Sequence, residues 1–203
     1  AWRAIQSALP KNAIISSDIG NNCAIGNAYP SFDEGRKYLA PGLFGPCGYG
    51  LPSIVGAKIG QPLVPVVGFA GDGAFGIAVN ELTAIGRDEW PAVTQIVFRN
   101  YQWGAEKRNS TLWFDDNFVG TELDTKVSYA GIAQACGLLG VQVQTMDQLT
   151  AVLNQAIKDQ MENNKTTVIE VILNQELGEP FRRDAMKKPV QVAGVTAADM
   201  AAE

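Results

Sequence analysis

The sequence predicts one α/β domain built on a parallel sheet flanked by helices. Apolar, β-branched runs at 13–19, 64–70, 93–98 and 166–173 alternate with stretches of helical periodicity. At 203 residues, 46% of them hydrophobic and 18% charged, the chain has the length and composition of one globular domain. Strands that alternate with helices favour a parallel sheet inside a single domain.

The first quarter of the chain supplies a helix, a strand and a glycine-rich segment. Residues 2–9 form a short helical pattern that ends at Pro10, and AIISSDI (13–19) reads as a strand. The polar turn GNNCAIGN (20–27) leads into a second helix. Residues 40–60 are rich in glycine and become helical from about Leu51, so backbone can approach backbone or a ligand closely there.

The middle of the chain contains two buried strands. VPVVGFA (64–70) is a continuous apolar run, and after the Gly-Asp-Gly turn the apolar residues between 75 and 85 fall at helical spacing. Trp90-Pro91 ends that helix, VTQIVF (93–98) is the next strand, and RNYQWG (99–104) breaks the pattern as a polar loop.

The last elements repeat the alternation. Residues 127–137 are helical, 140–145 form a strand, 146–164 form an amphipathic helix with Asp147 near its start, and 166–173 form a strong strand. We expect a domain over 1–190 and a frayed alanine-rich tail over 191–203. The chain opens on Ala1 and is helix-like from Trp2, so we expect a fragment or a processed piece of a longer protein.

Composition excludes several classes of function. The chain has no histidine, which rules out Ser-His-Asp and Cys-His catalysis and histidine-based zinc sites within it. A net charge of −5 argues against a nucleic-acid partner. No apolar run is long enough for a membrane helix, and the first ten residues lack the pattern of a signal peptide. Three widely spaced cysteines suit the reducing cytoplasm better than a disulfide framework.

The motif FAGDGAF (69–75) indicates a ligand site. Asp72 follows one apolar strand and Asn100 follows the next, and a right-handed crossover brings the ends of such strands to one edge of the sheet. A few oxygen ligands suit Mg²⁺, which takes phosphate oxygens and water for its other positions. Gly71 and Gly73 leave backbone N–H groups open, and a helix starting near Ala74 favours a bound diphosphate. An ordinary Gly-Asp-Gly turn is the alternative, which Asn100 at the next strand end disfavours.

The stretch from Gly71 to Asn100, GDGAFGIAVNELTAIGRDEWPAVTQIVFRN, resembles the cofactor motif of thiamine-diphosphate enzymes similar to acetolactate synthase. The family motif usually ends in Asn-Asn, and Arg99 departs from it. GPCGYGLPSIVGAKIG (45–60) is similar to the family segment that runs against the thiazolium, and SDIGNN (17–22) to its first cofactor loop. The resemblance covers nearly the whole chain and implies the C-terminal, diphosphate-binding domain of such an enzyme.

The resemblance implies specific ligands. Mg²⁺ takes the side chains of Asp72 and Asn100 and the backbone carbonyl of Gln102. We expect thiamine diphosphate to contact Asn21, Asn22, Cys47, Gly48, Gly71, Asp72, Gly73, Ala74, Asn100, Gln102, Trp103 and Gly104. Simple alternatives remain for some of these: turn formation for Asn21 and Asn22, and packing for Cys47 and Trp103.

Within the family, residues 99–123 and 178–189 are similar to the branch that acts on sulfoacetaldehyde and phosphate. The implied reaction is an acyl transfer that cleaves a C–S bond and releases acetyl phosphate and sulfite. The alternatives are a carboligase like acetolactate synthase, with an apolar acceptor pocket, and a cofactor-binding subunit without catalysis.

Anionic substrates call for cations near the site. The candidates are Arg99, Lys107, Arg108, and the tail residues Arg182, Arg183, Lys187 and Lys188. Arg99 is the first choice because it adjoins a metal ligand, although its side chain can instead point into the sheet. Glu106 is a candidate proton shuttle, or alternatively a surface partner of Lys107 or Arg108.

The family also needs a glutamate on a separate pyrimidine-binding domain, for which this chain has no room. We therefore expect the pyrimidine-binding and central domains to lie outside it. The resemblance implies a homo-oligomer in which the site lies between this domain and a partner subunit.

Overall fold

A six-stranded parallel sheet forms the centre of the molecule, in the order β2-β1-β3-β4-β6-β5. The computed structural model describes residues 1–33, 35 and 37–175. The strands are β1 (Ile14–Ser17), β2 (Tyr38–Leu39), β3 (Val66–Gly71), β4 (Thr94–Arg99), β5 (Leu139–Val143) and β6 (Thr167–Ile172). The parallel α/β sheet expected from the sequence is confirmed.

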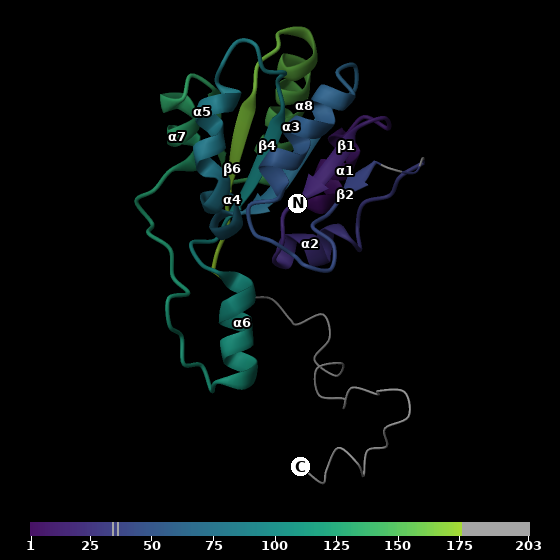
Figure 1. Ribbon diagram of the computed structural model, residues 1–203. Helices are drawn as coiled ribbons and strands as arrows, with labels where there is room; N and C mark the ends of the chain where they lie inside the picture. The colour runs from purple at the N-terminus through teal and green to yellow at the C-terminus, as the bar shows by residue number, and fades with distance from the viewer. Residues whose placement is uncertain (34, 36, 176–203) are drawn as a thin grey trace.

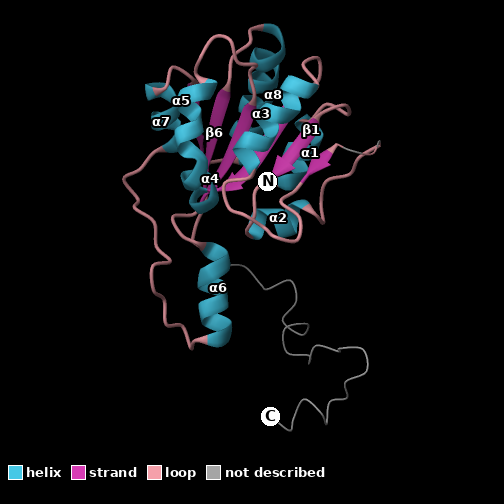
Figure 2. Cartoon of the chain, viewed as in Figure 1, coloured by secondary structure: helices cyan, strands magenta, loops and turns pink. Residues whose placement is uncertain are grey.

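Helices cover both faces of the sheet (Figures 1 and 2). The helices, with one 3₁₀ turn η1, are α1 (Trp2–Ala8), α2 (Asn21–Gly26), α3 (Gly50–Gly60), α4 (Asp72–Ala78), η1 (Val79–Glu81), α5 (Leu82–Ile85), α6 (Gly104–Trp113), α7 (Tyr129–Ala135) and α8 (Met146–Glu162). No helix in the described part of the chain has the length and apolar character needed to span a membrane.

Two apolar layers hold the helices to the sheet. On one face, α3, α4, α5 and α7 contribute Leu51, Ile54, Phe75, Leu82 and Ala133, among others. On the other face, Ile5 of α1 packs in the same cluster as Leu149 and Leu153 of α8. Nearly complete burial along β3 and β4 follows from this double cover, and it explains why the β3 segment reads as a continuous apolar run.

Four local features differ from the sequence expectation. Residues 20–27, expected as a polar turn that leads into a second helix, themselves contain α2 (Asn21–Gly26), and among the described residues the next helix is α3. The helix after Asp72 is interrupted by η1, so the apolar spacing from 75 to 85 spans three short pieces. The short strand β2 and the helix α6 were not anticipated. α6 stands away from the body of the domain (Figure 1), and none of its residues is buried.

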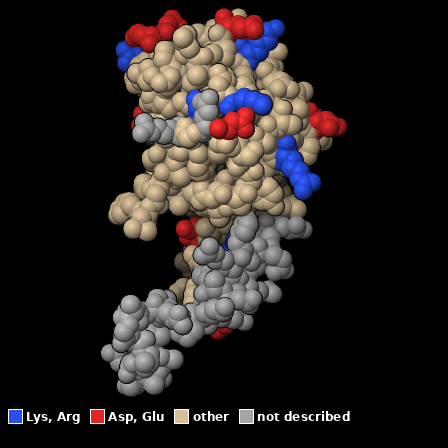
Figure 3. All heavy atoms as spheres, turned by 90° about the vertical axis from the view of Figure 1, so that its right-hand side faces the viewer, with Lys and Arg blue, Asp and Glu red and all other residues tan. Residues whose placement is uncertain are grey.

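Charged side chains of both signs share the surface. On the face seen in Figure 3, Lys and Arg side chains lie beside Asp and Glu side chains instead of forming a broad patch of one sign.

Candidate functional site

Parallel pairing brings the ends of β3 and β4 together. Gly71 at the end of β3 pairs with Phe98 of β4, so Asp72 and Asn100 follow their strands at the same edge of the sheet. This is the arrangement expected from the sequence, and it results from the crossover rule for parallel strands. Both polar residues therefore come directly after strands that are almost entirely buried.

Asp72 is a buried carboxylate with both oxygens engaged. It is 1% exposed; Oδ1 accepts the N–H of Gly73 at 3.0 Å and Oδ2 accepts the N–H of Tyr101 at 2.6 Å. Burial raises the pKa of this carboxyl, while the Tyr101 hydrogen bond and the nearby Arg99 guanidinium oppose the shift.

The amide group of Asn100 lies between two oxygens. With its nitrogen toward them it donates to Oδ1 of Asp72 at 3.2 Å and to the carbonyl of Gln102 at 3.1 Å. With its amide oxygen in that place, three oxygens converge on one point, which is a donor set suited to a hard divalent cation. Tyr101, between Asn100 and Gln102, adopts a left-handed φ of 61°, and this turn accompanies the approach of the Gln102 carbonyl to the Asn100 amide.

The residues predicted as metal ligands are thus brought together. They include a single carboxylate, that of Asp72. Among the described residues, no group of three His, Cys, Asp or Glu side chains is placed to hold a metal ion. The side chain of Gln102 turns away from Asp72: its Nε2 donates to the carbonyl of Gln175 and its Oε1 accepts from Lys107. Only its backbone carbonyl faces the converging oxygens.

A cavity of about 510 Å³ opens beside these oxygens. Its wall includes these predicted site residues: Asn21, Asn22, Cys47, Gly71, Asp72, Gly73, Ala74, Asn100, Gln102, Trp103, Gly104 and Glu106. Apolar residues that the sequence did not single out, Ile19, Ile25, Phe98 and Leu173, complete much of the wall. A partly apolar cavity with a few converging polar groups is the usual form of a cofactor site.

Gly73 is required by the packing of Trp103 against the start of α4. A Cβ at residue 73 would come within 2.7–2.9 Å of three indole atoms of Trp103. At Gly71, an added Cβ would lie 3.3 Å from the side-chain nitrogen of Asn22. The glycines flanking Asp72 therefore allow side chains of the cavity wall to approach the backbone closely.

Asp18 is a structural residue of the site that the sequence analysis did not identify. It is buried at the end of β1; Oδ1 accepts the N–H groups of Ile19 at 2.8 Å and Gly48 at 3.1 Å, and Oδ2 accepts that of Gly50 at 2.7 Å. Gly48 thus binds Asp18 and is not part of the cavity wall. An acidic residue at a strand end before glycine was the signal available in the sequence.

Arg99 lies behind Asp72 and does not line the cavity. It is 1% exposed, and its guanidinium lies 3.8 Å from Oδ2 of Asp72 and 3.1 Å from Oε1 of Glu170. The geometry therefore follows the alternative that the side chain points into the sheet, and it does not favour direct contact with an anionic substrate.

The charged residues of α6 divide into two groups. Glu106 and Arg108 line the cavity, whereas Lys107 donates to Gln102 and forms an ion pair with Glu122. Trp113, at the far end of α6, is 60% exposed and stands clear of the cavity. Arg182, Arg183, Lys187 and Lys188 lie outside the described residues, as does the expected tail over 191–203.

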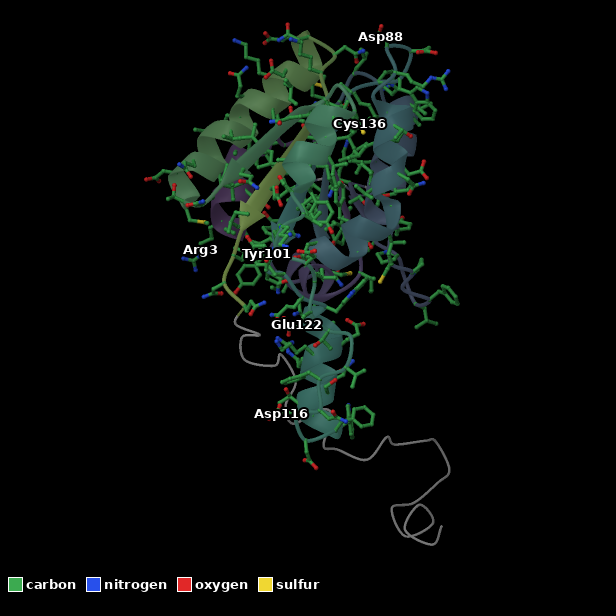
Figure 4. The ribbon with its side chains drawn as sticks, turned by 90° about the vertical axis from the view of Figure 1, so that its left-hand side faces the viewer. Arg3, Asp88, Tyr101, Asp116, Glu122 and Cys136 are labelled. Carbon is green, nitrogen blue, oxygen red and sulfur yellow. The ribbon has the colours of Figure 1, made fainter. Side chains whose placement is uncertain are left out.

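The segment around α6 is tied at its base to the loop that follows β4, residues 100–103. Gln102 and Glu122 form an antiparallel bridge; Trp103 donates its N–H to the carbonyl of Thr121 at 2.7 Å, and Leu123 to that of Tyr101 at 2.9 Å. Figure 4 shows Tyr101 and Glu122 near this base and Asp116 at the far end of the excursion. The pairing holds the loop that carries Asn100 and Gln102.

Comparisons with known proteins show which family the chain resembles. The family described as "Thiamine pyrophosphate enzyme, C-terminal TPP binding domain" matches residues 18–171. The chain is 82% identical over 200 residues to a sulfoacetaldehyde acetyltransferase of Roseovarius nubinhibens, covering 98% of this chain and 33% of the relative. It is 76% identical over 200 residues to the enzyme of the same name from Rhodobacter capsulatus, covering 98% and 34%.

A solved structure supports the fold. Benzoylformate decarboxylase from Polynucleobacter necessarius superposes with a TM-score of 0.75 at 22% identity, over 88% of this chain and 33% of that one. The chain spans about a third of the length of the curated relatives it matches.

Proposed function

The chain belongs to the thiamine pyrophosphate enzymes as a C-terminal TPP binding domain, and from this premise we propose that it supplies the diphosphate-binding half of a sulfoacetaldehyde acetyltransferase site. The proposed reaction converts sulfoacetaldehyde and phosphate to acetyl phosphate and sulfite. The C–S bond breaks with its electron pair on sulfite, the aldehyde carbon becomes an acyl group, and the neighbouring carbon becomes a methyl group. The internal oxidation and reduction balance, so no outside oxidant is needed.

The observation that carries the cofactor assignment is the convergence of Asp72, Asn100 and the Gln102 carbonyl beside the cavity. We assign Mg²⁺ to this point, with Oδ1 of Asp72 and the amide oxygen of Asn100 as side-chain ligands. Mg²⁺ completes its shell with phosphate oxygens and water, which fits a set of few protein ligands. The Gly73 position, closed to any side chain by Trp103, leaves backbone facing the cavity where a diphosphate would lie.

When bound, thiamine diphosphate supplies a carbon nucleophile and an electron sink. The remaining wall residues orient it and exclude water: Asn21 and Asn22 offer polar contacts, while Cys47 and Trp103 provide packing surface. We assign proton transfer during the reaction to Glu106, because its side chain lines the same cavity.

We assign recognition of the anionic substrates to Arg108. Among the described residues of the cavity wall it is the single Lys or Arg side chain. Sulfonate and phosphate both offer several acceptor oxygens, which suit the planar guanidinium fork. Arg99, the first choice from the sequence, is enclosed behind Asp72 and does not line this cavity.

The whole enzyme needs more than this chain. We propose that a pyrimidine-binding domain, in a homo-oligomer, closes the cavity from outside, and that the isolated chain binds Mg²⁺–thiamine diphosphate weakly and turns over nothing. Three free thiols support a reducing compartment such as the cytoplasm. Acetyl phosphate formation by the isolated chain would contradict the proposal that this chain alone turns over nothing.

The decisive experiment uses the full-length enzyme that carries this domain. Sulfite and acetyl phosphate are measured together from sulfoacetaldehyde, phosphate, Mg²⁺ and thiamine diphosphate. We expect both products in equal amounts and neither with Asp72→Ala. Acetolactate formation from pyruvate without sulfite release would instead place the enzyme with the carboligases.

The Arg108 assignment has its own test. Arg108→Gln should raise KM for sulfoacetaldehyde or phosphate by about 10-fold or more, as expected when a charge-assisted contact of 1.5–3 kcal/mol is removed. Arg87→Gln, at an exposed arginine paired with Glu89 and remote from the cavity wall, is the matched control. Equal KM values in the two variants would remove Arg108 from substrate binding.

A further inference from the structure

A buried charge cluster lies directly behind the proposed metal site. Arg99 places Nε 3.1 Å from Oε1 of Glu170 and Nη1 3.8 Å from Oδ2 of Asp72, and Nη2 donates to the carbonyl of Asp124 at 2.8 Å. Asp72, Arg99 and Glu170 are each at most 1% exposed. One guanidinium therefore lies between two carboxylates that are shielded from water.

Glu170 is anchored independently of Arg99. Its Oε2 accepts from the Ser128 hydroxyl at 3.0 Å, the Ala130 N–H at 3.1 Å and the Gln142 side chain at 3.0 Å. These donors fix the carboxylate on β6 against the start of α7. Glu170 is thus a fixed point from which Arg99 reaches toward Asp72.

The two aromatic rings beside Arg99 belong to residues that also bind Asp72. The Arg99 guanidinium lies 4.5 Å from the ring centre of Tyr101 and 5.1 Å from that of Tyr129. Tyr101 donates its N–H to Oδ2 of Asp72, and the Tyr129 hydroxyl donates to the Asp72 carbonyl at 2.8 Å. The guanidinium therefore packs between two groups that each restrain Asp72.

The two oxygens of the Asp72 carboxylate face different groups. Oδ2 faces the Tyr101 N–H and the Arg99 guanidinium. Oδ1 accepts the Gly73 N–H and faces the Asn100 amide, which in turn faces the Gln102 carbonyl. We infer that Arg99 is a positioning residue that holds Oδ2 of Asp72 toward Glu170, so that Oδ1 alone is presented to the metal. The inference rests on the proposed function, because it requires a divalent cation at Oδ1.

The test uses two variants of the full-length enzyme. Arg99→Lys keeps the charge but cannot bridge Asp72, Glu170 and Asp124 at once. The double variant Arg99→Met/Glu170→Gln removes the bridge without leaving Glu170 as an unpaired buried charge, which the single Arg99→Met change would do. Arg87→Met is the matched control at an exposed arginine.

The readout is the affinity for Mg²⁺ in the presence of thiamine diphosphate, measured by calorimetry, with thermal unfolding of the metal-free protein alongside. We expect both variants to fold and to bind Mg²⁺ about 10- to 100-fold more weakly, the usual effect of losing a group that orients a metal ligand. Excess Mg²⁺ should restore kcat, because the defect lies in holding the ligand.

Unchanged Mg²⁺ affinity in folded variants would overturn the inference and leave Arg99 with a purely structural role. Failure of both variants to fold would overturn it as well, since stability alone would then explain the residue. If the unsubstituted enzyme binds Mg²⁺ with the cofactor but releases no sulfite, sulfoacetaldehyde is not its substrate. The Mg²⁺ affinities of the variants still decide the role of Arg99 in that case.

Discussion

Asp18 accepts the backbone N–H of Gly50 at 2.7 Å, and this bond joins the end of β1 to the start of α3. The same carboxylate holds the N–H of Gly48, so one buried acid orders the segment that brings Cys47 to the cavity wall. The hydrogen bonds that stabilise the Asp18 carboxylate come from the backbone N–H groups of Ile19, Gly48 and Gly50.

This arrangement predicts a pH dependence of stability. Burial raises the pKa of Asp18 above its ordinary value of 3.8, although the N–H groups of Gly50, Ile19 and Gly48 oppose the shift. Between 3.8 and the higher folded pKa the folded state holds more protons, so the free energy of unfolding falls as pH rises through that window.

Asp18→Asn should remove this contribution. In urea unfolding between about pH 4 and pH 7, we expect the free energy of unfolding to fall less with pH in the variant than in the unsubstituted protein. We also expect the variant to be less stable at every pH, because its hydrogen bonding is altered. Other acids contribute equally to both proteins and cancel in the difference. Parallel curves would mean that Asp18 titrates alike in the folded and unfolded states.

Asp72→Asn tests the proposed metal ligand while preserving its shape. We expect the Mg²⁺ affinity measured with thiamine diphosphate to fall by about 100-fold or more, since a neutral amide replaces the one carboxylate among the three converging groups. Circular dichroism should show the sheet intact. Asp88→Asn, at an exposed aspartate, is the control; equal affinities in the two variants would move the metal away from Asp72.

The convergence of Asp72 and Asn100 was accessible from sequence because it depends on local rules. Two apolar runs, each followed by a polar residue, and the fixed hand of the crossover are sufficient to place both residues at one edge. The parallel sheet was accessible for the same reason. Neither inference requires knowing which helix packs on which face.

Other features depend on tertiary contacts that no local pattern reports. The position of Arg99 is decided by Glu170 on β6, a partner distant in sequence. α6 has no buried residue and therefore lacks the apolar stripe that reveals a helix. The strand β2 is only Tyr38–Leu39, too short for an alternating pattern.

Two helix caps offer a matched comparison. The Ser128 hydroxyl accepts the Gly131 N–H at the start of α7 and also donates to Glu170. Thr145 caps α8 through a capping box with Gln148. Replacing either residue by alanine should cost about 1 kcal/mol of stability, measured by chemical denaturation. Only Ser128→Ala should also weaken Mg²⁺ binding, because it loosens the anchor of Arg99; identical Mg²⁺ affinities would separate the α7 cap from the metal site.

Gly73→Ala tests the fit between α4 and Trp103. The added Cβ would lie 2.7–2.9 Å from the indole, so the ring must shift from the cavity wall. We expect a stability loss of about 1–3 kcal/mol from overpacking. If about 1.4 kcal/mol of this loss destabilises the cofactor-bound state relative to the free state, the cofactor should bind roughly 10-fold more weakly.

Gly56→Ala is the control for this change. Gly56 lies within α3, and a Cβ there meets no other atom within 4 Å. Alanine should stabilise the helix by about 0.5–1 kcal/mol and leave cofactor affinity unchanged. Both quantities come from thermal unfolding and calorimetry on the same preparations. If Gly73→Ala behaved like Gly56→Ala, Trp103 would be free to move without loss, and the close approach of its indole to α4 would have no part in forming the site.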